Sequence, residues 1–203
     1  MTTLSTRSAH LRNWLVQQGL TDTAPLSDWL AQARERSLAR DEYLLRAGEQ
    51  HHFLCFIDSG LLRLFYVSPE GKERNKAFYT DNHLVGPVSA AISDGPAPFS
   101  IQALEASNVL LLPYQPFVAA SATHPAVAQL NIRLLSNAFV RNEQREAMLL
   151  TCNAEQRYRW LLAQEPELPE RLPQHHIASY LGVDAVSLSR LKRKLRAQDE
   201  YGQ

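Results

Sequence analysis

The stretch around Gly182 constrains the fold more than any other part of the chain. Ile177, Ala178 and Leu181 fall on one face of a short predicted helix, and Gly182 follows it directly. Glycine readily adopts the left-handed backbone conformation that ends a helix. Asp184 is a favourable capping residue for the start of a second helix. The spacing therefore predicts two helices that cross closely at the small Ala178 and are joined by a tight turn.

The second predicted helix, from about residue 185 to 196, separates into two faces. Leu188, Leu191 and Leu195 recur at the spacing of a buried apolar stripe. The opposite face begins with small or uncharged residues and then carries Arg190. Such a face, at the N-terminal end of the second helix of a pair, is where a recognition helix meets base edges in the major groove.

Basic residues gather in this helix although the net charge of the chain is zero. Residues 185–198 contain five basic side chains and no acidic one, which suits binding to phosphates. The sequence therefore predicts a DNA-binding helix-turn-helix, with an ordinary helical hairpin that has a solvated basic face as the alternative. The predicted DNA-binding residues are Gln174, Asp184, Ala185, Val186, Ser187, Ser189, Arg190, Lys192, Arg193 and Lys194.

Residues 41–113 have a different character, because short β-rich runs alternate with turn signals. Turns are indicated by Ala47-Gly48-Glu49, Asp58-Ser59-Gly60, Ser68-Pro69-Glu70-Gly71 and Ser93-Asp94-Gly95-Pro96. Strands of this length and spacing predict an antiparallel sandwich or a barrel-like roll. The expected strands are residues 43–45, 53–57, 61–67, 77–79, 101–104 and 109–112.

Helices are expected on both sides of this β-rich part. Residues 1–40 are predicted to form short helices that cover it, with one start near Pro25. Residues 126–150 predict one long helix whose apolar side chains occupy more than one face, which suits a dimer seam. The alternative is that this helix packs only on its own β-roll. The predicted dimer residues are Val127, Leu130, Leu134, Ala138 and Arg141.

Several other classes of protein are disfavoured. The N-terminus lacks the apolar core of a signal peptide and no apolar run could span a bilayer, which favours a cytoplasmic protein with no membrane partner. Cys55 and Cys152 are too few for the four thiolates of an iron–sulfur cluster and are expected to be reduced thiols. His51, His52 and His83 lack standard metal-ligand spacing. We also find no nucleophile–base pair, so no enzyme, metal or cofactor is expected.

Together these features resemble the Crp/Fnr superfamily, which includes the cyclic-AMP receptor protein, over residues 40–196. The resemblance implies a β-roll like that of cyclic-nucleotide-binding domains, a dimerisation helix and a C-terminal helix-turn-helix that reads DNA as a homodimer. In many relatives β-strands follow the recognition helix, and we expect this sequence to have no room for them after its last predicted helix. The motifs that carry the resemblance are Gly48, Ile57–Phe65, Gly71-Lys72-Glu73, Gly86, Ala103-Leu104-Glu105, Ile177-Ala178, Leu181-Gly182-Val183 and Ser187–Leu191.

The chain departs from that family where cyclic nucleotides bind. In nucleotide-binding members a glutamate follows the glycine at the Gly86 position and holds the ribose, whereas Pro87 stands here. An arginine followed by serine or threonine grips the phosphate in those members, whereas Ala97 and Pro98 stand here. No Lys or Arg occurs from residue 77 to 132, so a buried phosphate would lack a cation. We therefore expect no high-affinity binding of cyclic AMP or cyclic GMP.

The predicted pocket is mainly apolar, which favours a filled core over a hydrophobic ligand. A sensor for an uncharged or cationic effector stays open as an alternative to a vestigial sensor. The residues predicted to line this pocket are Val85, Gly86, Pro87, Val88, Ala97, Pro98, Phe99 and Ser100.

The recognition helix departs from the family pattern as well. Ala185 and Val186 stand where relatives carry base-reading arginine and glutamate, and only Arg190 persists.

The sequence thus predicts an α+β fold with three parts. These are a helical cover with a β-roll sensor over residues 1–125, a dimerisation helix over 126–152 and a DNA-binding domain over 153–203. The expected partners are double-stranded DNA, a second copy of the chain, RNA polymerase and an unidentified small effector. A β-roll regulatory module without a DNA role is the alternative function, and a cupin-like enzyme is disfavoured because the predicted strands hold few histidines.

Overall fold

The computed structural model describes residues 6–201, without the side chains of residues 90, 91 and 196–201. The chain divides into two compact units. The β-roll unit comprises the chain up to Val67 together with Lys76–Ser136, and the helical unit comprises Ser68–Asn75 and the chain from Asn137. The predicted α+β class with antiparallel sheets is confirmed. The two predicted domain boundaries, after residues 125 and 152, stay predictions.

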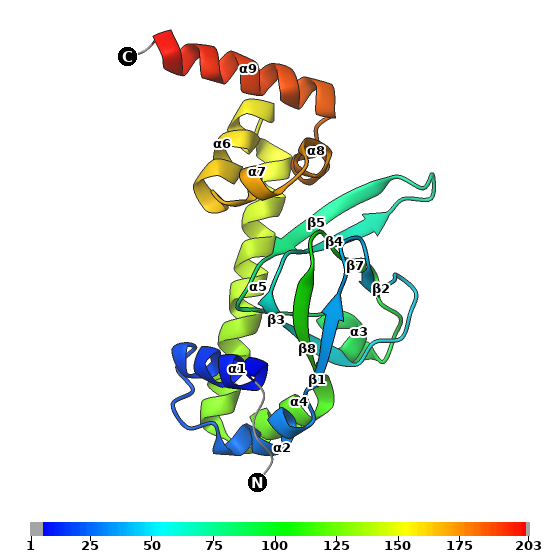
Figure 1. Ribbon diagram of the computed structural model, residues 1–203, viewed down its shortest axis with the longest axis vertical. Helices are drawn as coiled ribbons and strands as arrows, with labels where there is room; N and C mark the ends of the chain where they lie inside the picture. Colours follow the sequence, from blue (N-terminus) through cyan, green and yellow to red (C-terminus); the bar gives the residue numbers. More distant parts are fainter. Residues whose placement is uncertain (1–5, 202–203) are drawn as a thin grey trace. The chain divides into compact units, whose positions relative to one another are not determined.

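Two four-stranded sheets form the β-roll (Figure 1). The strands pair in antiparallel fashion, β1 with β8, β3 with β6 and β8, and β7 with β2 and β4. The first sheet has the order β1 (Arg34–Leu38), β8 (Ser107–Pro113), β3 (Phe53–Ser59) and β6 (His83–Val85). The second has the order β2 (Tyr43–Leu45), β7 (Ser100–Ala103), β4 (Leu62–Val67) and β5 (Glu73–Tyr79).

The space between the two sheets is filled by aliphatic and aromatic side chains. Ile57 and Val109 from the first sheet meet Leu62, Leu64 and Ile101 from the second, all in one buried cluster. Because side chains alternate along a strand, Leu62 and Leu64 of β4 both enter this cluster. The two sheets therefore enclose a hydrophobic core inside the β-roll.

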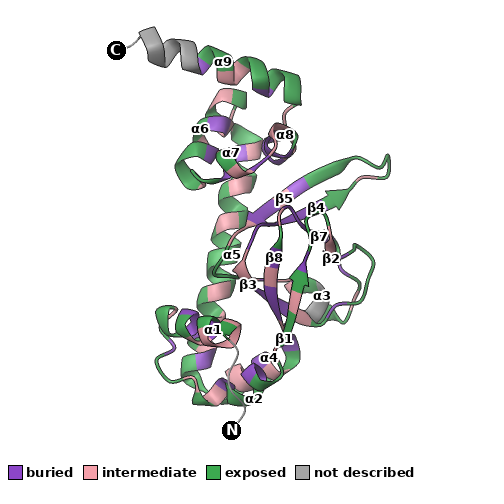
Figure 2. Ribbon diagram, viewed as in Figure 1, coloured by how far each residue is buried: buried purple, intermediate pink, exposed green. Residues whose placement is uncertain are grey.

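Helices cover the outer face of the first sheet. They are α1 (Thr6–Gln17), η1 (Ala24–Leu26), α2 (Ser27–Ala31), α4 (Tyr114–Thr123) and the beginning of α5 (Pro125–Thr151). Trp14 of α1 and Trp29 of α2 pack with Phe56 of β3 and Phe117 of α4 in a second buried cluster. Figure 2 shows buried positions along these helices. The predicted helical cover for the roll is thus present.

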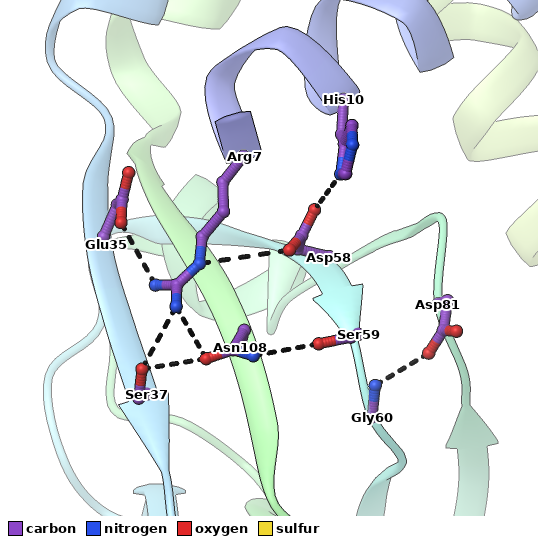
Figure 3. Close-up of polar contacts among 9 residues, drawn as sticks. All are labelled: Arg7, His10, Glu35, Ser37, Asp58, Ser59, Gly60, Asp81 and Asn108. Carbon is purple, nitrogen blue, oxygen red and sulfur yellow. Dashed lines mark hydrogen bonds and ion pairs between the residues drawn. The ribbon is translucent and has the colours of Figure 1, made fainter. Parts of the chain in front are cut away.

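Polar contacts hold the N-terminal end of α1 on the sheet (Figure 3). Arg7 donates to Oδ1 of Asn108 at 2.7 Å and lies 3.2 Å from the carboxylate of Glu35. His10 Nδ1 lies 2.7 Å from Oδ1 of Asp58. These contacts reach three different strands, so they fix the position of α1 along the sheet as well as its distance from it.

The structure corrects three expectations within this unit. Residues 34–38, predicted to be helical, form strand β1, since their charged sequence lies at the sheet edge and gives no apolar alternation. Strand β6 and the short helix α3 (Val88–Ser93) were not predicted. Val127 and Leu130 are fully buried in their own chain, so these two do not form a face for a partner, while Leu134 is half-buried against the same cluster and stays a prediction.

The helical unit contains the rest of α5 and four further helices among the described residues. These are α6 (Ala154–Gln164), α7 (Leu168–Arg171), α8 (Gln174–Leu181) and α9 (Ala185–Tyr201). Asn153 and Gln156 form a reciprocal capping box that starts α6. The tip of the β4–β5 hairpin, residues 68–75, also belongs to this unit. Over residues 6–201, no helix combines the length and apolar character needed to cross a membrane.

Candidate nucleic-acid interface

Helices α8 and α9 are joined by the tight turn that the sequence predicts. Gly182 has φ 65° and ψ 31°, the left-handed conformation. The amide of Val183 donates to the carbonyl of Ala178 at 3.0 Å and closes the turn. A Cβ on Gly182 would lie 3.2 Å from Nη1 of Arg157, so a side chain is disfavoured there by both conformation and space.

The two faces of α9 are also as predicted, except that Leu191 is half-buried rather than buried. Leu188 is fully buried and Leu195 nearly so, and together they seat α9 on the helices beneath it. Val186 is 60% exposed, and Ala185, Ser189 and Arg190 are exposed on the N-terminal turns. A small, uncharged surface followed by one guanidinium is thereby presented to the surroundings.

Four predicted DNA-binding residues make contacts with one another inside the motif. Oδ1 of Asp184 accepts from the amide of Ser187 at 2.8 Å, so Asp184 caps α9 as expected. Hydrogen bonds from Ser187 to this carboxylate lower its pKa. The side chain of Gln174 donates to the carbonyl of Ala185 at 3.0 Å and links the beginnings of α8 and α9. These residues shape the motif, and their contact with DNA stays a prediction.

The basic residues further along α9 differ in their surroundings. Arg193 is exposed. Nζ of Lys194 lies 3.5 Å from a carboxylate oxygen of Glu155, and both side chains are partly exposed. Nζ of Lys192 lies 5.9 Å from the centre of the Tyr158 ring. An ion pair exposed in this way is weak, so Lys194 is able to exchange it for a phosphate. Lys192, by contrast, is half-buried beside the buried Tyr158.

Arg157 of α6 fixes the motif to the end of the long helix. Its guanidinium donates to the carbonyls of Cys152 at 2.8 Å, Leu149 at 2.8 Å and Leu181 at 3.0 Å. The carbonyls at the last turn of a helix have no partner within the helix, so one arginine satisfies the ends of both α5 and α8. The sequence offered no signal for this contact, because the partners are backbone atoms far apart in the chain.

A second group of charges surrounds Tyr180 of α8. The Tyr180 hydroxyl donates to Oε1 of Glu165 at 2.8 Å, and Arg141 lies 3.1 Å from the same oxygen. Burial raises the pKa of Tyr180, so the hydroxyl stays protonated and can donate. Arg145 stacks on the Tyr180 ring, with its guanidinium carbon 4.7 Å from the ring centre. Arg141, predicted for the dimer face, is therefore engaged within its own chain.

The predicted pocket residues of the β-roll differ in their burial and surroundings, and their role as a pocket stays a prediction. Val85, Ala97 and Phe99 lie in the apolar cluster between the sheets, and Pro87 is also buried. The hydroxyl of Ser100 is buried and accepts from the amide of Ala47 at 3.0 Å. The remaining three differ in exposure, since Pro98 is exposed while Gly86 and Val88 are half-buried.

A buried cation lies on the outer side of the second sheet. Nε of Arg63 donates to Oε1 of Gln102 at 2.8 Å, and its guanidinium stacks on the Phe65 ring at 3.9 Å. Alternation along β4 separates Arg63 from its neighbours Leu62 and Leu64, which enter the interior. Arg63 therefore does not replace the cation that a phosphate in the interior would need.

Comparison with known proteins agrees with this architecture. Residues 35–124 match the family model of the cyclic nucleotide-binding domain. The chain is similar to a fumarate and nitrate reduction regulatory protein of Vibrio cholerae, with 28% identity over 169 residues that cover 78% of this chain and 67% of that protein. It thus spans about two thirds of that relative's length.

Solved structures show the same fold. FixK2 from Bradyrhizobium japonicum has a TM-score of 0.71 at 19% identity, covering 82% of this chain and 86% of FixK2. A regulator assigned to the Crp/Fnr family from Eubacterium rectale has a TM-score of 0.72 at 16% identity, covering 92% of this chain and 88% of that one. The chain therefore contains a cyclic nucleotide-binding domain, is similar in sequence to a fumarate and nitrate reduction regulatory protein over most of its length, and shares the fold of solved regulators of the Crp/Fnr family.

Proposed function

We propose that this chain acts as a homodimer that reads a near-palindromic operator through α9, without responding to cyclic AMP. The observation that carries the proposal is the exposed N-terminal face of α9, held by the turn at Gly182 and by the buried Leu188. A regulator that binds an operator would work in the cytoplasm, where the DNA is. RNA polymerase is the partner that a regulator bound beside a promoter would contact.

Within the operator, Arg190 is the residue proposed to read a base. Its side chain is exposed on α9, and guanidinium pairs with guanine through two hydrogen bonds. The neighbouring Ala185 and Val186 suit apolar contact with thymine methyl groups. The operator should therefore differ from that of the cyclic-AMP receptor protein, whose recognition helix is charged at these positions.

Replacing Arg190 by alanine is expected to cost about 1–3 kcal/mol of specific binding, because one bidentate base contact is lost. Fluorescence anisotropy with the selected operator and with a scrambled duplex measures this. The matched variant is Lys192→Ala, which should weaken both duplexes alike and flatten the salt dependence. An Arg190→Ala chain with unchanged operator affinity would contradict the assignment.

The proposed dimer face is the side of α5 that its own chain leaves exposed. Ile132, Leu135 and Phe139 are 63%, 41% and 62% exposed, and their spacing places them on one side of the helix. Ala138, predicted for the dimer face, is also exposed, and Figure 2 shows the middle of α5 as largely exposed. Apolar residues grouped in this way mark an interaction surface. A second copy fits, because paired α5 helices would bury the same residues on each other.

We infer that cyclic AMP does not bind in the β-roll. The interior positions are occupied by Val85, Ala97 and Phe99, and residues 77–132 supply no Lys or Arg. Calorimetry with cyclic AMP up to millimolar concentration is expected to show no binding of micromolar strength, since the phosphate would be buried without a cation. A dissociation constant of micromolar or tighter would overturn this inference. A filled core fits the interior better than an apolar effector does.

A further inference from the structure

Asn75 is a buried polar residue in strand β5, and its burial is explained by hydrogen bonds to helices of the helical unit. It is 2% exposed and lies at the point where the tip of the β4–β5 hairpin, residues 68–75, ends. Asparagine is uncommon within strands, and burying its amide is costly without hydrogen bonds. Helices of the helical unit supply partners that offset this cost.

Three polar groups of Asn75 contact these helices. Its backbone amide donates to Oγ of Ser179 at 3.0 Å. Its side-chain Nδ2 donates to the carbonyl of His176 at 3.0 Å. Its carbonyl accepts from Nη2 of Arg145 at 2.9 Å, and the same nitrogen donates to the carbonyl of Tyr180 at 3.0 Å. Asn75 thus joins the hairpin tip to α8 directly and to α5 through one guanidinium.

Ser179 completes the contact from the side of α8. Its hydroxyl accepts from the amide of Asn75 and donates to the carbonyl of Glu73 at 3.2 Å. The Ser179 hydroxyl therefore acts as both donor and acceptor. It bonds to the backbone of two strand residues, Glu73 and Asn75, that are two positions apart. Loss of this hydroxyl would remove one hydrogen bond from each of two backbone groups of the tip.

These contacts leave the recognition face exposed. They involve α8, whereas Val186 and Arg190 on α9 stay exposed. Helix α8 in turn positions α9, through the bond from Gln174 to the carbonyl of Ala185 and through the turn at Gly182. A tip that holds α8 is therefore compatible with DNA binding and favours one orientation of α9.

We propose that the hairpin tip is a positioning element of the helix-turn-helix, in which Asn75 and Ser179 hold α8 so that α9 can enter the major groove. This inference rests on the proposed DNA-binding function. Neither residue is required to touch DNA. They raise the fraction of molecules whose motif is correctly placed, and apparent affinity scales with that fraction.

The test compares single hydroxyl deletions in the full-length chain. Ser179→Ala removes the contact between tip and α8, whereas Ser68→Ala removes a hydroxyl that bonds to Glu70 and Lys72 within the tip itself. Ser179→Ala is expected to weaken binding to the selected duplex at least about threefold, because two hydrogen bonds between the tip and α8 are lost. Ser68→Ala and the hydroxyl-retaining Ser179→Thr should stay within about twofold of the parent.

Two further readouts separate positioning from a general loss of stability. The salt dependence of Ser179→Ala should match that of the parent, because the number of phosphate contacts is unchanged. Hydrogen exchange of the free protein should become faster in residues 68–75 and in α8 while the strands of the β-roll keep their rates. Equal affinities for Ser179→Ala and Ser68→Ala would overturn the positioning role, as would unchanged exchange in α8.

Failure of the underlying function gives a different result. A parent chain that enriches no duplex would overturn DNA binding and the positioning role with it. The exchange comparison would then still decide whether the tip holds α8, because it needs no DNA.

Discussion

Replacement of Phe139 by aspartate should convert the dimer into a monomer and weaken operator binding by about a hundredfold to ten-thousandfold. The side chain is 62% exposed on α5 in the single chain, so a charge there costs little in the monomer. In the proposed dimer it would be buried unpaired against the partner helix, which is strongly unfavourable. Two linked motifs gain roughly 10²–10⁴ in avidity over one, and the monomer loses this gain.

Light scattering gives the mass of the Phe139→Asp chain, and anisotropy gives its affinity for the selected operator. The matched control is Val16→Asp on α1, where valine is 45% exposed on a different helix. This control should remain dimeric and bind DNA as the parent does. A dimeric Phe139→Asp chain, or a parent chain that is monomeric at micromolar concentration, would contradict the proposed dimer face.

Gly60→Ala is expected to reduce the free energy of unfolding of the β-roll unit by roughly 2–6 kcal/mol. Gly60 has φ 120°, a conformation that residues with a side chain rarely adopt. A Cβ at this position would collide with the side chain of Ser107 and lie 2.7 Å from its Cα atom. The amide of Gly60 also donates to Oδ1 of Asp81 at 2.7 Å, so the backbone cannot turn away without losing that bond.

Gly48→Ala provides the control, because Gly48 also has positive φ, at 90°, but a Cβ added there would meet no atom within 4 Å. Only the conformational cost of about 1 kcal/mol is expected there. Urea unfolding followed by tryptophan fluorescence compares the two, since Trp14 and Trp29 are buried in the same unit. Equal losses for the two variants would show that the close approach of Ser107 is relieved without cost.

Much of the fold could be predicted because the local signals were strong. Gly182, Asp184 and Leu188 each imposed a conformation or a buried position that depends only on near neighbours in the chain, and all three are as expected. The turns at Gly60 and Gly71 also have positive φ. Local chemistry of this kind needs no knowledge of the tertiary structure.

What could not be predicted depended on distant partners. The apolar spacing of Val127 and Leu130 correctly indicated burial, but it could not say that their own N-terminal helices bury them. Strand β1 is stabilised by pairing with β8, and this pairing could not be predicted from the charged sequence of β1. Asn75 and Arg157 gave no signal, because each acts on backbone groups of helices that are remote in sequence.

The most direct test of operator reading is selection of random duplex DNA by the purified chain, with and without cyclic AMP. We expect enrichment of a near-palindrome whose half-sites lie about 10 base pairs apart, to the same extent in both conditions. Enrichment only with cyclic AMP would overturn the inference drawn from Pro87, Ala97 and Pro98. Enrichment of no sequence, even at low salt, would contradict the proposed operator reading.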